Sequence, residues 1–243
     1  MILCCVRYGQ LGNQMLLLAH LFAFARQYRK TLLCPSFSPY ANYFEALQNN
    51  PLCMLPGLRG PVCSRCTRKL VADFFRKLGQ DKKVFRFGLR YLHPFLAWKH
   101  IGWKGLCDLA SPAEAETVAM LRHTPLVLLE GWRFRDYPSF TQQEPAIREV
   151  LTPTRAHLDA AQKAVDGLRR EAPEAPVVGL HIRRGDYQFV FPQFFLELPE
   201  VQAVMHLIQQ RHESAGDPPP VFLIASNQTF ATGDFPGQRV AFA

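Results

Sequence analysis

Short apolar runs alternate along the chain with longer stretches in which apolar residues recur every three or four positions. The short runs predict strands at residues 2–6, 31–37, 125–132, 177–182 and 221–225, with a last apolar piece at 239–243. The longer stretches predict helices at residues 13–29, 154–171 and 198–214. This alternation favours an α/β protein with parallel sheets, in which ligands lie beyond the carboxyl ends of the strands.

Two interruptions of this pattern predict the domain organisation. The Pro-rich stretch "EAPEAP" at residues 171–176 predicts a boundary between an N-terminal domain, residues 1–172, and a C-terminal domain, residues 173–243. Residues 50–112 lack clear periodicity and are rich in Pro, Gly and charge. They predict an irregular basic insertion in the first domain.

A glycine turn, "GQLGNQ", follows the first predicted strand and precedes the first helix. Its two glycines, Gly9 and Gly12, allow the backbone to approach another group closely, and the helix after them begins with free amides. Such a turn can hold a phosphate or a sugar hydroxyl. Tight packing of a strand against a helix explains the same pattern equally well.

The stretch "HIRRGDY" follows the predicted strand 177–182. If Ile182 points into the core, strand alternation places His181 and Arg183 together on the other face. The planar guanidinium of Arg183 suits a pair of phosphate oxygens, and Asp186 can hold an arginine in position or act as a base. The alternative is a surface Arg–Asp pair at a turn. An adhesion role for "RGD" is disfavoured, because the tripeptide follows a buried strand.

The net charge of +8 is unevenly spread along the chain. Residues 59–104, from Arg59 to Lys104, hold 12 Lys and Arg against 2 acids, with aromatic residues between them. This basic segment suits nucleic acid, anionic lipid headgroups or an acidic glycan carrier, and an ordinary solvated face is the alternative. A basic RNA-interacting protein is therefore one class of function to test.

The cysteines and the amino terminus bear on the cellular compartment of the protein. Seven cysteines are an odd count, and residues 1–6 lack the features of a signal peptide, so we expect reduced cysteines and a cytoplasmic protein. No apolar run reaches the roughly 18–20 residues that span a bilayer. Cys63 and Cys66 have the spacing of half a zinc site, but no second pair follows at the usual distance.

Three segments together resemble a known family. "GQLGNQM", then "LEGWRFRDYPSF" with "IREVLTP", then "GLHIRRGDY" occur in the order seen in the α1,2-fucosyltransferases of glycosyltransferase family 11. The resemblance spans most of the chain except about residues 50–120. It implies a GT-B-like fold of two Rossmann-like domains, inversion at the sugar carbon, and no metal or other cofactor.

The resemblance also implies roles for individual residues. Arg183 matches the arginine expected on the β-phosphate of GDP-fucose, where it would stabilise the charge of the leaving group. In the same motif Arg184 and Asp186 match, and His181 would orient the nucleotide. The loop residues Gly9, Gly12, Asn13 and Gln14 match the turn near the sugar and diphosphate, with Asn13 as the best polar contact. The general base is open between Glu130 and Asp186.

Two departures from the family pattern accompany these matches. Family members carry S-D-D after a strand, whereas this chain has Ser226, Asn227 and Gln228, whose amides can hydrogen-bond a nucleotide but supply no carboxylate. The sequence also stops at Ala243, before the family's downstream segment, so we expect an incomplete second domain. A non-catalytic homologue that binds a glycan or nucleotide is therefore the alternative function.

Together these points predict a fucosyltransferase with GDP-fucose as donor and an oligosaccharide or lipid-linked glycan as acceptor. Catalytic residues would be Arg183, Asp186 and Asn13, and substrate-binding residues would include Ser226 and Asn227. We expect no metal and no nucleic-acid partner. Residues 59–104 would contact the inner face of a membrane peripherally.

Overall fold

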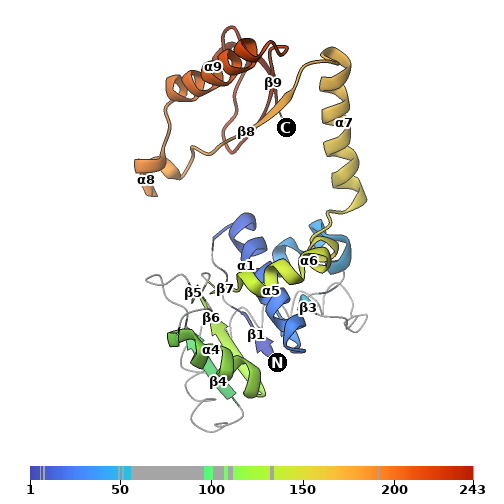
Figure 1. Ribbon diagram of the computed structural model, residues 1–243, viewed down its shortest axis with the longest axis vertical. Helices are drawn as coiled ribbons and strands as arrows, with labels where there is room; N and C mark the ends of the chain where they lie inside the picture. Colours follow the sequence, from blue (N-terminus) through green and yellow to red (C-terminus); the bar gives the residue numbers. More distant parts are fainter. Residues whose placement is uncertain are drawn as a thin grey trace. The chain divides into compact units, whose positions relative to one another are not determined.

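The computed structural model describes residues 1–5, 7, 9–48, 50, 52–55, 96–100, 107–108, 112–131, 134–190 and 192–242. The chain divides into two compact units, Met1–Arg155 and Ala156–Ala243. Each unit has a sheet of mainly parallel strands with helices packed on it (Figure 1). The predicted α/β class with parallel sheets is confirmed.

The first unit is built on a five-stranded sheet with the order β3-β2-β1-β6-β4. In this spatial order the strands are Met54–Leu55, Leu32–Leu33, Ile2–Leu3, Leu126–Glu130 and Leu96–His100. All neighbours are parallel except β3, which runs antiparallel to β2 at one edge. A separate parallel pair joins β5 (Cys107–Asp108) to β7 (Phe134–Arg135).

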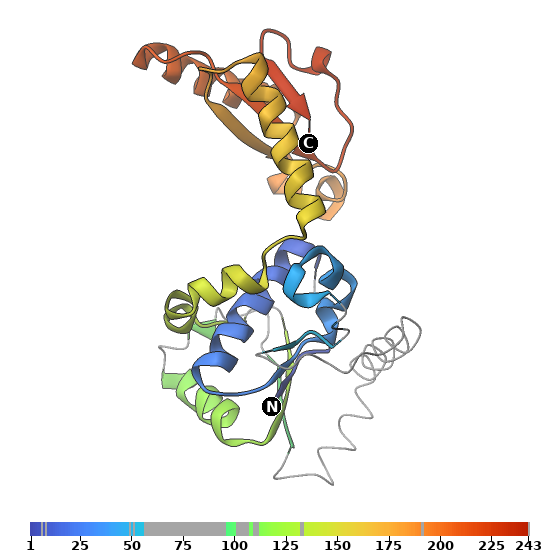
Figure 2. The ribbon, with the colours of Figure 1, turned by 90° about the vertical axis from the view of Figure 1, so that its right-hand side faces the viewer.

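Helix α1 (Leu11–Gln27) contributes a continuous buried segment to the core of this unit. Its residues from Leu17 to Ala25 are all buried, so the helix is covered on every side. Figure 2 shows α1, in blue, along one face of the sheet. The other elements of this unit are α4 (Pro112–His123), α5 (Tyr137–Gln142), α6 (Glu144–Val150), and the 3₁₀ helices η1 (Pro35–Tyr43) and η2 (Glu45–Leu47).

His20 is a titratable group buried inside this unit. It is 1% exposed, and its Nδ1 accepts a hydrogen bond from the Asp136 backbone N–H at 3.1 Å. The ring also packs on Tyr137 and Phe140. Burial lowers the pKa of His20 below its ordinary value of 6.5, so the neutral ring joins α1 to the start of α5.

The second unit has a three-stranded parallel sheet with the order β10-β9-β8, formed by Arg239–Phe242, Val221–Ser226 and Val177–Ile182. Helix α9 (Leu198–Ala215) packs on one face, where Met205 contacts the cluster of Ile182 and Phe222. The helix α7 (Arg155–Glu171) packs on the other face through Leu168. Short helices complete the unit: α8 (Tyr187–Val190), η3 (Pro192–Phe194) and η4 (Thr232–Asp234).

The structure differs from the sequence prediction in two places. The prediction of an irregular segment at residues 50–112 is wrong for β3, β4 and β5, of which β3 and β4 join the main sheet of the first unit. The unit boundary lies at Arg155, ahead of the predicted position at residue 172. Helix α7 belongs to the second unit because Leu168 and Ala172 pack against Val221 of β9.

Some predictions lie outside the described residues, including the Cys63–Cys66 spacing and most of the basic segment 59–104. Cys4, Cys5, Cys34 and Cys53 are buried and free. Burial raises the pKa of the Cys5 thiol to about 12, which keeps it protonated. Among the described residues, the structure has no helix that is both long enough and apolar enough to cross a membrane.

Candidate functional site

The turn after β8 holds the two arginines of the "RRGD" motif. Ile182 is buried and His181 is exposed, as strand alternation predicts. The Arg183 Nη2 donates to Asp186 Oδ2 at 3.0 Å, and the guanidinium lies over the Tyr187 ring, 4.6 Å from its centroid. The Arg183 side chain is 31% exposed. It is therefore held on two sides while part of its charge still faces solvent.

Arg184 has a different environment. Its side chain is 16% exposed, donates to Glu197 Oε2 at 2.9 Å, and lies over the Phe195 ring. Glu197 is also the N-cap of α9, where it forms a capping box with Glu200. The buried Arg184 Nε has no hydrogen-bond partner. Arg184 thus connects the turn to the start of α9 and keeps one donor unused.

Asn227 braces the same turn from the end of β9. Its Oδ1 accepts a hydrogen bond from the Arg184 backbone N–H at 3.0 Å. Gly185 has a φ of 23°, and a Cβ there would lie 2.4 Å from Asn227 Nδ2. Only glycine fits this position without moving the Asn227 side chain. An aspartate at residue 227 would make the same bond to Arg184, so the missing carboxylate does not affect the brace.

A pocket of about 330 Å³ opens at the carboxyl end of β9. Its polar lining comes from Ser226, Asn227, Gln228 and Thr229, and its apolar lining includes the rings of Phe230 and Phe242. Ser226 Oγ accepts from the Gln228 backbone N–H at 3.0 Å, which shapes the loop. Sequence reasoning missed Thr229 and Phe230 as lining residues. The signal was available, because polar and aromatic residues directly follow a buried parallel strand.

The glycine turn of the first unit lies at the start of α1. Gly9 has a φ of 67°, a conformation that favours glycine, and the Asn13 side chain folds over it. Around Gly12 a side chain would meet no atom within 4 Å. Gln10 caps α1 without a side-chain hydrogen bond, so the first amides of this 17-residue helix are not capped by it. Asn13 is exposed beside these amides, whereas Gln14 is buried.

One cation near this turn was missed from the sequence. Arg7 donates from Nη2 to the Tyr40 hydroxyl, and its guanidinium lies 4.9 Å from the centroid of the Tyr40 ring. Arg7 lies between β1 and the glycine turn and is exposed. It was not singled out because a single arginine before a glycine turn carries no motif of its own.

The predicted site residues therefore fall into two groups, each brought together within its own unit. Gly9, Gly12, Asn13 and Gln14 lie in the first unit, and Glu130 ends β6 there. The second group comprises His181, Arg183, Arg184, Asp186, Ser226 and Asn227. A single site that uses both groups stays a prediction. In the described part of the chain, no three His, Cys, Asp or Glu side chains cluster as metal ligands.

No protein-family model and no curated protein matches the chain. Among solved structures, the chain is similar to a mutant of Arabidopsis thaliana FUT1 in complex with GDP. The TM-score is 0.45 at 14% sequence identity, and the match covers 100% of this chain and 59% of that chain. A similarity of this size assigns neither a family nor a reaction.

Proposed function

We propose that this chain is a glycosyltransferase that uses GDP-fucose and transfers fucose to a glycan hydroxyl. The observation that carries the proposal is the guanidinium of Arg183 at the carboxyl end of a parallel strand. It is held by Asp186 and is partly exposed. That edge is where α/β sheets bind ligands, and an arginine fork matches two phosphate oxygens. The order of the sequence motifs favours fucose as the sugar and α1,2 as the linkage.

In this proposal Arg183 stabilises the diphosphate as the bond to the sugar breaks. The charge on the leaving oxygen grows in the transition state, so a cation already in position lowers the barrier. The ion pair with Asp186 and the ring of Tyr187 fix the guanidinium before the donor arrives. We therefore assign Asp186 the role of positioning Arg183. Of the two candidates for the general base, Glu130 is then the one that remains.

The pocket at the end of β9 suits the nucleoside part of the donor. Amides such as Asn227 and Gln228 can pair with the polar edge of a base, and aromatic rings such as Phe230 can contact its face. Asn227 also touches the turn that holds Arg183 and Arg184. A nucleotide bound in this pocket would therefore have its phosphates near the two arginines.

The glycine turn of the first unit would contribute backbone amides and Asn13 to the sugar or diphosphate. The uncapped start of α1 favours negative charge, since the helix dipole and the free N–H groups point the same way. In an inverting transfer the acceptor oxygen attacks the sugar carbon, the bond to the β-phosphate breaks, and the acceptor proton goes to a base. The acceptor remains a galactose-ended or related glycan by analogy with the sequence motifs.

A transfer assay tests this function directly. The chain is incubated with GDP-fucose and a panel of galactose-ended oligosaccharides without added metal, and GDP release and the fucosylated product are both measured. We expect product with at least one acceptor and none with UDP-sugars. Donor binding without any transfer would favour the non-catalytic homologue. The absence of both binding and transfer would contradict the proposal. Salt-sensitive RNA binding with no response to GDP would favour an RNA-interacting protein.

A further inference from the structure

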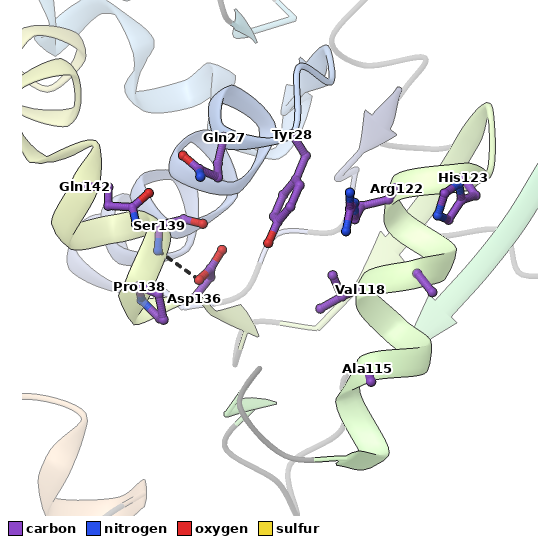
Figure 3. A pocket seen from close by; sticks show the side chains of 11 residues that line it. Gln27, Tyr28, Ala115, Val118, Arg122, His123, Asp136, Pro138, Ser139 and Gln142 are labelled. Atoms are coloured by element: carbon purple, nitrogen blue, oxygen red, sulfur yellow. Dashed lines mark hydrogen bonds between the residues drawn. The ribbon is translucent and has the colours of Figure 1, made fainter.

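A second pocket, of about 420 Å³, lies wholly within the first unit. It is formed by the last turn of α1, one face of α4 and the beginning of α5, as Figure 3 shows. Ala115, Val118 and Ala119 of α4 and Pro138 of α5 supply apolar lining. The predicted donor site uses none of these residues. A pocket of this size is in the range for small-molecule ligands.

Asp136, a lining residue of this pocket, is a buried acid that is only 3% exposed. Its Oδ1 accepts a hydrogen bond from the Ser139 backbone N–H at 3.1 Å and caps α5. Its buried Oδ2 has no hydrogen-bond partner. Figure 3 shows the carboxylate directed into the pocket, with the Tyr28 hydroxyl turned toward it. A buried carboxylate oxygen without a donor is costly, so a donor supplied by a ligand would stabilise it.

The opposite wall of the pocket carries positive charge. Arg122 of α4 lines the pocket, and its guanidinium lies 5.0 Å from the centroid of the Tyr28 ring, which limits its motion. His123 and the amides of Gln27 and Gln142 complete the polar lining. Gln27 is itself oriented, because its Oε1 accepts a hydrogen bond from Gln143. One wall thus presents a carboxylate and the other a guanidinium.

We propose that this pocket binds a small zwitterion that carries an ammonium group and a carboxylate, as a free amino acid does. The ammonium would donate to Asp136 Oδ2, because a charged donor makes a stronger hydrogen bond to a carboxylate than a neutral hydroxyl does. The ligand's carboxylate would pair with Arg122, whose planar fork matches it. The Gln27 and Gln142 amides would hydrogen-bond the remaining polar atoms. This site is independent of the proposed transfer reaction.

The test is a ligand-observed NMR screen of the full chain with the twenty common amino acids, each at 10 mM. For any amino acid that binds, the N-acetylated form lacks the ammonium and the decarboxylated amine lacks the carboxylate. We expect at least one amino acid to bind. The N-acetylated form should bind at least tenfold more weakly, and the amine should bind several-fold more weakly than the parent. D-Galactose serves as a neutral polyol of similar size.

Two variants locate the binding. Asp136→Asn keeps the shape and capping ability at this position but removes the charge, so affinity should fall at least tenfold. Ala119→Phe fills the pocket from an exposed position of α4 and leaves Asp136 unchanged, so it should also abolish binding even if Asp136→Asn proves unstable. Absence of binding by all twenty amino acids would overturn the proposal. So would unchanged affinity in Ala119→Phe, or galactose binding as tightly as the amino acid.

Discussion

The turn after β1 and the turn after β8 both follow a strand with parallel neighbours but are built differently. The first turn has Gly9 in a left-handed conformation, the exposed Asn13 over it, and the amides at the start of α1. The second turn carries charge, with Arg183 paired to Asp186 and Arg184 paired to Glu197. The first turn therefore offers oriented backbone dipoles, with the cation Arg7 just before it, and the second turn itself carries two arginines.

This difference predicts that the two turns tolerate different changes. A site made of backbone amides depends on the conformation of its glycines, because a side chain at the wrong φ moves the amides. A site made of arginines depends on the partners that fix each guanidinium. In the second unit, Asn227 bears on both the glycine conformation and the placement of the arginines. It accepts a hydrogen bond from the Arg184 backbone and lies against Gly185.

The largest effect is expected from Arg183→Ala. Removal of a preorganised group that stabilises transition-state charge costs on the order of 10²–10³-fold in turnover, so fucose transfer should fall by that factor. Arg169→Ala, on the exposed side of α7, removes an equal charge away from the turn and should leave transfer unchanged. Thermal unfolding should be similar for both variants. Normal transfer by folded Arg183→Ala would rule out the role given to this residue.

The two glycines of the first turn provide a matched pair. Gly9→Ala places a side chain at φ 67°, with its Cβ 2.3 Å from Asn13 Nδ2, and should lower the free energy of unfolding by about 1–2 kcal/mol. Gly12→Ala has space around it within a helix and should raise that energy by about 0.5 kcal/mol. Urea unfolding of both variants measures the difference. Equal effects would mean that the left-handed turn is not required.

Lowering the pH should weaken the first unit through His20. Because burial lowers the pKa of this histidine in the folded state, the unfolded chain binds more protons as the pH falls through 6.5. The stability contributed by the neutral His20 ring is therefore fully present above pH 6.5. It is lost as the pH falls below 6.5, by up to about 1.4 kcal/mol per pH unit. His20→Gln should flatten this part of the curve, as followed by urea unfolding between pH 5 and 8. His157→Gln, on exposed α7, is the control.

The smallest effect is expected at Asn227. Two substitutions there separate its bracing of the turn from its proposed contact with the nucleotide. Asn227→Ala removes the acceptor for the Arg184 backbone and should cost about 1 kcal/mol of stability. Asn227→Asp keeps that acceptor, so stability should stay close to that of the parent chain. Donor affinity should fall in both variants if the Asn227 amide also contacts the nucleotide. Loss of stability in Asn227→Asp comparable to that in Asn227→Ala would contradict the bracing role.

Local patterns in the sequence predicted much of the fold. Strand β8 was predicted with the bounds that it has, and α9 to within one residue, because apolar periodicity and the cap at Gly216 mark them clearly. The strand β4 was missed, since its letters "LAWKH" mix apolar and basic residues and its partner β6 is distant in sequence. Helix α7 was assigned to the wrong unit because Leu168 meets Val221 only in the folded chain.

The candidate site was likewise predicted only in part from local patterns. Motifs pointed to Arg183 and Asp186, and Ile182 is buried, which is the condition under which alternation turns His181 away from the core. No pattern revealed that Glu197, thirteen residues after Arg184, would hold that arginine, or that Asn227 would bond its backbone. The environment of Asp136 was also beyond the sequence, since its pocket brings α1 together with α4 and α5, which are distant from α1 along the chain.

Calorimetric titration with GDP tests the central claim most directly, because it asks whether the turn after β8 binds a diphosphate. The parent chain, Arg183→Ala and Arg169→Ala are titrated with GDP and GDP-fucose without metal, with ADP as the comparison nucleotide. We predict that the guanine nucleotides bind the parent chain and Arg169→Ala, that ADP binds at least tenfold more weakly, and that Arg183→Ala loses at least tenfold in affinity for GDP. Equal GDP affinity in Arg183→Ala, or no binding of GDP by the parent chain, would contradict the account.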